Sequence, residues 1–431
     1  MHGGVYKRRT PEKSDLYRIT YQHFEEYEKI YPERYEEEYG YFRKIITATI
    51  CKYLDCGIME NGFARIRCPD CGHDFFVAFS CKTRFFCPSC SEKRTLIWGG
   101  WVNENVLKNV SHRQWVFTIP KVLRKLFYKD RLLLAELARC AAAIILELYG
   151  AIFPDNRFRP GIIASTQTFG DLLIWHPHIH CLVTDGVFDL AGSFHPLLGI
   201  DSDQATILFR EKVFAMMKER NRISDGLVEK MRNWHHSGFS VHNEVVIQKE
   251  DREALVRLAQ YVVHASFSSE KIRYVEKTNC VMYKSKLHQG KKLNFEVLDA
   301  IEFLHRVCLH IPEHYEALIR YYGHYANAAR GKRKKLGLEI ELPLNIIDDA
   351  PNRRVCRKSW AQLIYQVYET DSLQCPKCGA QMKIIAFILK REEVIRILKH
   401  LAMWPIEYPR PAAIETRVSP FDFKLLRKLS D

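Results

Sequence analysis

Three histidines occupy alternate positions in the segment His176-Pro177-His178-Ile179-His180, and an apolar run follows them. This period-two pattern predicts a strand, on which alternate residues point to the same face. His178 and His180 should therefore project side by side from a rigid element. Two adjacent imidazoles supply half of a metal site, so we expect them to hold one divalent ion. His176 shares that face, but it precedes a proline where the strand only begins. The alternative is a surface strand without metal.

The cysteines indicate a second kind of metal chemistry. Six of the fourteen cysteines form three Cys-x-x-Cys pairs, which is typical of zinc in a reducing cytosol and predicts a cytoplasmic protein. Cys68-Pro69-Asp70-Cys71 and Cys87-Pro88-Ser89-Cys90 are separated by fifteen residues, a spacing at which two knuckles can surround one ion. We therefore predict one structural zinc bound by Cys68, Cys71, Cys87 and Cys90. A redox dithiol, the alternative, would need only one pair.

Other cysteines are harder to assign. Cys51, Cys56 and Cys81 could be core thiols or ligands of a second ion. Cys375-Pro376-Lys377-Cys378 is half of a possible second zinc site, for which Cys356 and His400 are the candidate partners.

Composition indicates a globular, nucleic-acid-binding protein. The chain has 431 residues and a formal net charge of +14, which favours a polyanionic partner. Basic residues are interleaved with phenylalanines around the knuckles, as suits a DNA backbone and exposed bases. Charged residues interrupt the most apolar stretch, 132–153, so it predicts a buried helix and no membrane partner. No phosphate-binding Gly-x-x-x-x-Gly-Lys-Ser/Thr loop occurs in the sequence, so no nucleotide cofactor is expected.

The predicted strands and helices do not follow the regular strand–helix–strand order of a doubly wound parallel sheet. This irregular order favours an α+β class, with an antiparallel domain over about 112–275. Strands are predicted at 115–119, 162–169, 177–185 and 239–248. Helices are predicted at 42–54, 92–109, 122–148, 204–222, 225–234, 252–265 and 300–328. The predicted division is a helical lead-in (1–60), a zinc-ribbon DNA-binding domain (61–110), the antiparallel domain (111–275), a helical basic region (276–340) and a C-terminal segment with a knuckle (341–431).

Several motifs, in their order along roughly 40–400, resemble the HUH rolling-circle transposases of the IS-ninety-one type. They are Ser80-Cys81-Lys82 ahead of Phe86-Cys87-Pro88-Ser89-Cys90, Gln167-Thr168-Phe169-Gly170 before the histidines, Thr184-Asp185-Gly186-Val187-Phe188, Tyr261, Arg320-Tyr321-Tyr322-Gly323 and Cys375-Pro376-Lys377-Cys378-Gly379. The histidine motif alone is short, and its order with the zinc ribbon and the tyrosine helix makes the resemblance specific.

The resemblance implies a chemistry. An HUH endonuclease domain is an antiparallel sheet flanked by helices, in which two histidines hold one divalent ion and a helix tyrosine attacks single-stranded DNA. By position, His178 and His180 would bind Mg²⁺ or Mn²⁺, and Tyr261 would form a 5′-phosphotyrosine at the end of a mobile element. Some relatives carry a second tyrosine one helical turn later. Here that position is Ala265, which predicts a single-tyrosine enzyme with Tyr274 and Tyr283 as weaker alternatives.

Two other functions stay open at this point. A plasmid replication initiator or a relaxase would use the same chemistry, although the zinc ribbon and the lack of a helicase motif disfavour it. A non-catalytic zinc-ribbon DNA-binding protein would not use the histidines for cleavage.

A third metal ligand is predicted from strand pairing. If 162–169 and the histidine strand form a hairpin turning near 170–175, Gln167 can lie opposite His178. Directly opposed residues share a face, with Cβ atoms about 5 Å apart, so the amide oxygen of Gln167 could reach the same ion. Alternatively, Gln167 only forms hydrogen bonds across the strands. His176 and His264 are the rival ligands.

Overall fold

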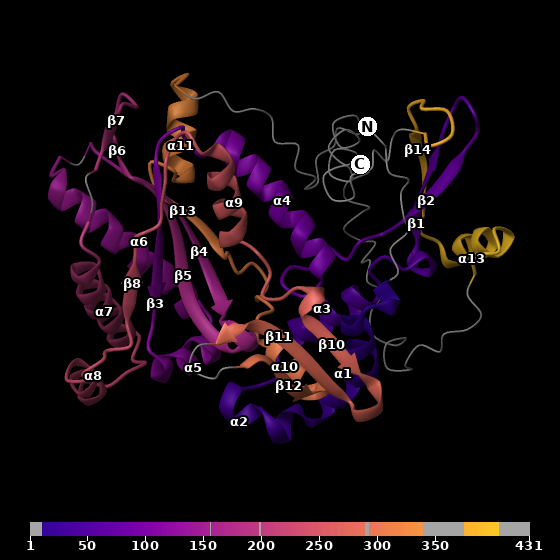
Figure 1. Ribbon diagram of the computed structural model, residues 1–431, viewed down its shortest axis with the longest axis horizontal. Helices are drawn as coiled ribbons and strands as arrows, with labels where there is room; N and C mark the ends of the chain where they lie inside the picture. The colour runs from indigo at the N-terminus through magenta and orange to yellow at the C-terminus, as the bar shows by residue number, and fades with distance from the viewer. Residues whose placement is uncertain (1–10, 156, 198–199, 289–292, 339–374, 405–431) are drawn as a thin grey trace.

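The computed structural model describes residues 11–155, 157–197, 200–288, 293–338 and 375–404 (Figure 1). Within these ranges the chain has mixed helices and antiparallel sheets, which confirms the predicted α+β class. Cys356, a candidate partner of the C-terminal knuckle, lies outside the described residues. In the described part, no helix is long and apolar enough to cross a membrane.

The central sheet has the strand order β13-β4-β5-β3-β8, and β9 pairs with β3 beside β8. All of its pairings are antiparallel. The strands span β3 (His112–Thr118), β4 (Gly161–Phe169), β5 (Trp175–Thr184), β8 (Ser240–His242), β9 (Val246–Ile247) and β13 (Ile319–Gly323).

Helices cover both faces of this sheet (Figure 1). On one face α6 (Leu132–Ile152) and α7 (Ser202–Glu219) pack against Trp115, Phe117 and Ile179. On the other face α4 (Pro88–Asn105) and α9 (Arg252–Val262) pack against Ile163 and Leu182. Because both faces are covered, β4 and β5 are buried along almost their whole length, including polar residues such as Gln167 and His180.

A second layer combines the N-terminal helices with residues 272–309, which follow the central strands in the sequence. Its sheet has the order β10-β11-β12, and α1 and α10 pack together against it. Its elements are α1 (Asp15–Arg34), α2 (Glu36–Tyr39), α3 (Lys44–Leu54), β10 (Ile272–Val275), β11 (Cys280–His288), β12 (Leu293–Asp299) and α10 (Ala300–Leu309). Helices α1 to α3 cover most of residues 15–54, and Tyr27 and Tyr31 of α1 are buried against α10.

A third, smaller lobe joins segments that are far apart in the sequence. Its sheet has the order β14-β1-β2 and is packed by α13 (Figure 1). The elements are β1 (Phe63–Arg67), β2 (Asp74–Ala78), β14 (Lys383–Ile388) and α13 (Arg391–His400). Phe63 pairs with Ile388 on one side and Ala78 on the other. The C-terminal segment is therefore part of the same lobe as the N-terminal knuckle.

Three predicted elements differ from the structure. The helix expected over 300–328 ends at Leu309, and Ile319–Gly323 forms the edge strand β13 instead. Its aromatic residues suit a strand, and pairing with β4 satisfies its backbone. This edge strand of the central sheet lies beyond residue 275, where the antiparallel domain was expected to end. The helix expected over 122–148 is divided at Asp130 into α5 (Lys121–Lys129) and α6, and the strand at 239–248 is divided into β8 and β9. The other strands and α-helices among the described residues are β6 (Gly186–Phe188), β7 (Phe194–Pro196), α8 (Asp225–Arg232) and α11 (Asn327–Lys335).

Candidate functional site

His178 and His180 lie together on β5, as the sequence pattern predicts. Their Nε2 atoms are 3.1 Å apart, and both side chains are almost fully buried. Burial lowers the pKa of His178 to about 4 and that of His180 to about 3. Both rings are therefore neutral at physiological pH, which is the state in which imidazole can ligate a metal.

The outer nitrogens of the two rings have partners. His178 Nδ1 lies 2.8 Å from the backbone oxygen of His176 and donates to it, which leaves the lone pair on Nε2. His180 Nδ1 lies 3.1 Å from the side-chain amide of Gln114 on β3. Two nitrogens bound at right angles to one ion, each at about 2.1 Å, would be about 3 Å apart. The pair therefore fits a divalent ion, and Gln114 is an orienting residue that the sequence pattern did not reveal.

Tyr261 lies beside this pair on the last turn of α9. Its ring meets that of His180 edge to face at a centroid distance of 5.8 Å, and it stacks on His264 at 4.8 Å. The side chain is 52% exposed. Leu255 and Ala259 on the same helix are buried against the sheet, so packing of α9 places the tyrosine over the histidines.

The predicted register of the β4–β5 hairpin is confirmed. Gln167 lies directly opposite His178, and Ser165 lies opposite His180. The Gln167 amide nitrogen donates to the backbone oxygens of Tyr261 (3.3 Å) and Val262 (3.0 Å). Gln167 thus ties the end of α9 to the histidine strands, and its amide group is held beside the histidines.

The third metal ligand stays a prediction. Among the described residues, no His, Cys, Asp or Glu brings a ligand atom within 4.8 Å of both histidine nitrogens. His264 is close to Tyr261, with its Nδ1 hydrogen-bonded to the backbone oxygen of that residue. His176 is near His178, at a ring-centroid distance of 5.1 Å, and no described residue forms a hydrogen bond with its buried Nε2.

The two alternative tyrosines lie in the second layer. Tyr274 on β10 is 4% exposed, and its hydroxyl lies 2.7 Å from His23 Nε2. Tyr283 on β11 is 3% exposed, and burial raises the pKa of its hydroxyl. Neither environment favours an attacking phenolate.

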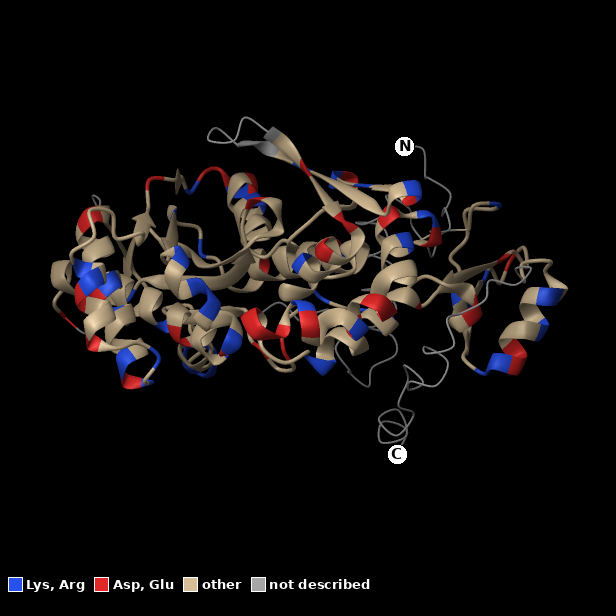
Figure 2. Cartoon of the chain, turned by 90° about the horizontal axis from the view of Figure 1, so that it is seen from below, with Lys and Arg blue, Asp and Glu red and all other residues tan. Residues whose placement is uncertain are grey.

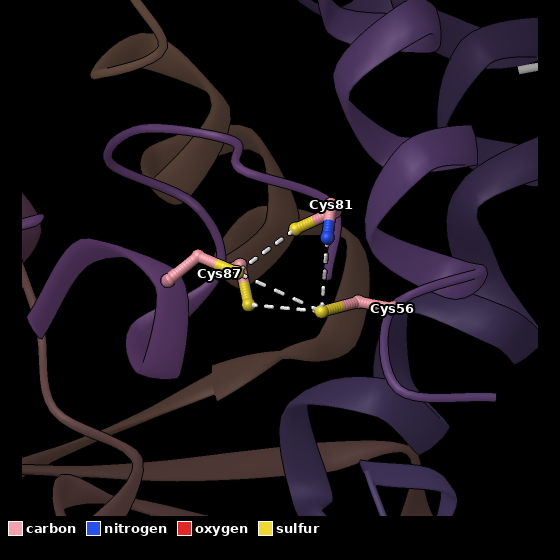
Figure 3. Close-up of side chains that lie close together, drawn as sticks. Cys56, Cys81 and Cys87 are labelled. Atoms are coloured by element: carbon pink, nitrogen blue, oxygen red, sulfur yellow. Dashed lines mark hydrogen bonds between the residues drawn. The ribbon is translucent and has the colours of Figure 1, made fainter. Parts of the chain in front are cut away.

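The cysteines assemble into two clusters, and the predicted set of Cys68, Cys71, Cys87 and Cys90 is wrong. In the first cluster, Cys87 and Cys90 meet Cys56 and Cys81. The Sγ distances are 3.8 Å for Cys56–Cys87, 3.7 Å for Cys56–Cys90 and 3.5 Å for Cys81–Cys90. Figure 3 shows Cys56, Cys81 and Cys87 turned toward one another.

In the second cluster, Cys68 and Cys71 meet Cys375 and Cys378. The Sγ distances are 3.5 Å for both Cys68–Cys378 and Cys71–Cys375. The pairing of β1 with β14 brings the two knuckles together, which explains why sequence spacing chose the wrong partners. His400 lies on α13 outside this cluster, and Cys356 lies outside the described residues.

The two knuckles of the second cluster have the same turn. Gly72 (φ +67°) and Gly379 (φ +74°) each follow the second cysteine of their pair and donate to the backbone oxygen of the first. The backbone N–H groups of Cys68 and Cys375 donate to His73 and Ala380, both at 2.8 Å. Four thiolates at about 2.3 Å from one ion would lie about 3.8 Å apart, so both clusters fit closed, structural zinc sites.

The chain is similar to known transposases. A family model described as a transposase zinc-binding domain matches residues 22–119, and one described as a putative transposase matches residues 161–333. The transposase for insertion sequence element IS801 of Pseudomonas savastanoi pv. phaseolicola is 28% identical over 372 residues, 81% of this chain and 86% of that protein. The putative transposase y4qJ of Sinorhizobium fredii (strain NBRC 101917 / NGR234) is 25% identical over 342 residues, 72% of this chain and 81% of that protein. No solved structure matches the chain significantly.

The two family models together cover more than half of the chain, and the first includes Cys56, Cys81, Cys87 and Cys90. These features define a zinc-binding transposase that acts on DNA. The chain belongs to the transposases of the IS-ninety-one type.

Proposed function

We propose that this transposase cleaves and rejoins single-stranded DNA at the ends of its mobile element through a covalent bond to Tyr261. The observation that carries the proposal is the position of the Tyr261 ring, 5.8 Å from that of His180, which in turn lies next to His178. Phosphodiester transfer needs a nucleophile, groups that can bind a metal ion and access for the DNA. The phenol, the two imidazoles and the exposure of the Tyr261 side chain meet these needs. The names of the relatives favour transposition over plasmid replication or conjugative transfer.

The chemistry balances without an external energy source. The phenolic oxygen of Tyr261 attacks phosphorus and loses its proton, and the bond to the 3′-oxygen breaks. The 3′-oxygen takes up a proton as a free hydroxyl, and the 5′-phosphate becomes joined to tyrosine. The number of phosphoester bonds is unchanged, so a 3′-hydroxyl can reverse the step and rejoin a strand.

His178 and His180 would hold Mg²⁺ or Mn²⁺. That ion would offset negative charge on the scissile phosphate. The protein's own residues orient this site: His176 fixes the ring of His178 through its backbone oxygen, and Gln114 contacts the ring of His180. Gln167 holds the end of α9, and therefore the backbone of Tyr261, against the same strands. We retain Gln167 as the proposed third ligand, through its amide oxygen.

The division of the chain into domains is also a proposal. The central sheet with its helices would form the catalytic unit, and the zinc-binding parts would supply DNA contacts. The two closed cysteine clusters would have a structural role, since four thiolates leave no open position on zinc.

A covalent adduct tests the proposal. Wild-type protein is incubated with Mn²⁺ and labelled single strands from each end of its element, and the products are separated on a denaturing gel. We expect a labelled protein band that Tyr261→Phe abolishes, because only the attacking oxygen is removed. Tyr274→Phe is the matched control and should form the adduct, since that hydroxyl is engaged elsewhere. An adduct that persists in Tyr261→Phe would show that another residue is the nucleophile.

A further inference from the structure

A cavity of about 220 Å³ lies between the zinc-binding part of the chain and the central sheet. One wall is a single face of α4, and the opposite wall is the β4–β13 edge with the residues just after α9. The lining residues are Arg84, Phe85, Ser91, Arg94, Thr95, Trp98, Ser165, Val263, Ala265, Leu318 and Ile319. This set contains two arginines and two serines but no carboxylate.

The two arginines lack a counterion of their own. Among the described residues, neither Arg84 nor Arg94 forms a hydrogen bond or an ion pair with the protein. The carboxylate that influences Arg84 is Glu316, which already forms two hydrogen bonds, of 2.8 and 3.0 Å, to Arg131. Burial and the charge of Arg94 both lower the pKa of Arg84. Two uncompensated guanidinium groups facing one cavity favour an anion there.

In the view of Figure 2, Lys and Arg are interspersed with Asp and Glu along the helices. The loop that carries Arg84 is fixed locally. It lies between Cys81 and Cys87 of the first cluster, and Lys82 (φ +53°) and Phe85 (φ +63°) adopt left-handed conformations on either side of the arginine. Such backbone strain persists only where the surrounding structure imposes it.

The cavity adjoins the candidate active site. Ser165, on its wall, lies directly opposite His180 in the β4–β5 pairing, where opposed Cβ atoms are about 5 Å apart. Val263, on the same wall, is two residues after Tyr261, and its backbone oxygen lies 3.5 Å from the Thr95 hydroxyl of α4. The cavity wall therefore includes residues that are the immediate neighbours of His180 and Tyr261.

We propose that Arg84 and Arg94 bind a backbone phosphate of single-stranded DNA next to the phosphate that Tyr261 attacks. This inference rests on the proposed function and extends it, because the zinc-stabilised loop and α4 would then form part of the substrate-binding site. The first cysteine cluster holds the two ends of the Arg84 loop. Loss of that zinc should weaken DNA binding through this loop.

The first experiment measures binding alone. The affinity of a fluorescein-labelled oligo-dT strand is determined by fluorescence anisotropy over a range of salt concentrations, in the Tyr261→Phe background so that no cleavage occurs. Each lost phosphate contact on a single strand should reduce the slope of log Kd against log salt by about 0.7. Because both arginines would contact the same phosphate, we expect a reduction of about 0.7 for the double variant and a smaller reduction for Arg84→Gln and for Arg94→Gln alone.

Control variants show whether a changed slope comes from loss of a local phosphate contact, from loss of a positive charge in general or from unfolding. Arg232→Gln removes the same charge from α8, outside the cavity, and should leave the slope unchanged. Zinc content and melting temperature are measured for every variant. Arg94 is exposed, so its substitution should not disturb folding even if that of Arg84 does. Equal slopes in Arg94→Gln and Arg232→Gln would overturn the proposal.

The second experiment locates the phosphate. Element-end strands are prepared with one neutral methylphosphonate at each position in turn, and the rate of adduct formation is measured. A methylphosphonate at one position close to the cleaved bond should lower the rate of adduct formation by the wild-type protein. The same substitution should not lower the rate of the Arg84→Gln/Arg94→Gln variant any further. An equal effect in both proteins at every position would also overturn the proposal. If wild-type protein forms no adduct at all, the proposed function fails, while the binding experiment still decides the role of the arginines.

Discussion

Substitution of Cys375 by serine tests how the cysteines are partitioned. The structure joins Cys375 and Cys378 to Cys68 and Cys71, and joins Cys87 and Cys90 to Cys56 and Cys81. We therefore expect two zinc ions per chain. Cys375→Ser should lose one of them and leave the other in place. Cys87→Ser should also lose one ion, but from the other cluster.

The expected size of the effect follows from the small lobe. Its two cores are built around only a few buried side chains, among them Phe63, Ile66 and Leu398. A structural zinc contributes roughly 10–16 kcal/mol of apparent binding energy in small peptides, as much as the total stability of many domains, about 5–15 kcal/mol. Without its zinc, the lobe should lose the pairing of β14 with β1. The central sheet shares no cysteine cluster with β14 and should stay folded.

Metal content and protease sensitivity are measured together. Zinc per chain is determined by elemental analysis after gel filtration, and limited proteolysis follows the release of residues 375–404. Cys280→Ser is the matched control, because Cys280 belongs to neither cluster and is only partly exposed. It should retain two zinc ions and resist the protease as wild type does. The partition would be refuted if the Cys375→Ser protein kept two zinc ions. It would also be refuted if the wild-type chain held a single zinc ion and Cys375→Ser kept that ion.

Three further predictions concern the candidate active site and the stability of the sheet. Gln167→Leu should raise the Mn²⁺ concentration needed for adduct formation and spare metal-free DNA binding; an unchanged metal titration would exclude Gln167 as a ligand and direct attention to His176 and His264. Gly323→Ala should lower stability by about 2 kcal/mol or more, because Gly323 has φ +58° and an added Cβ would lie 2.0 Å from the Pro160 oxygen. Gly331→Ala, where no atom lies within 4 Å of the added Cβ, should be neutral or stabilising in the same melting assay. Stability should also fall as the pH drops from about 6.5 towards 4. Burial lowers the pKa of His112 from 6.5 to about 4 in the folded state. The unfolded chain therefore binds more protons than the folded chain in this pH range. That difference is worth about 3 kcal/mol at 1.36 kcal/mol per pH unit, and a flat profile in urea titrations over this range would contradict it.

Local pattern was sufficient for the histidine strand and its immediate partners. The alternation at His178 and His180 predicts one face of a strand, and β5 places both rings on that face. The turn after Phe169 is short, so the hairpin register that sets Gln167 opposite His178 could also be anticipated. The half-exposed position of Tyr261 follows from helical periodicity. These features depend on interactions within a few residues or across one hairpin, which the sequence order already constrains.

Tertiary structure decided the features that depend on pairing between distant segments. Spacing alone grouped Cys68 and Cys71 with Cys87 and Cys90, whereas the antiparallel pairing of β1 with β14 brings in Cys375 and Cys378. Residues 319–323 join the sheet as a strand because β4 offers an unpaired edge, which no local periodicity records. The opposition of Arg84 and Arg94 to the end of α9 likewise requires the docking of α4 on that helix. In each case the decisive contact joins residues that are far apart along the chain. Such residues meet only when the whole chain folds, so local sequence patterns carry no information about the contact.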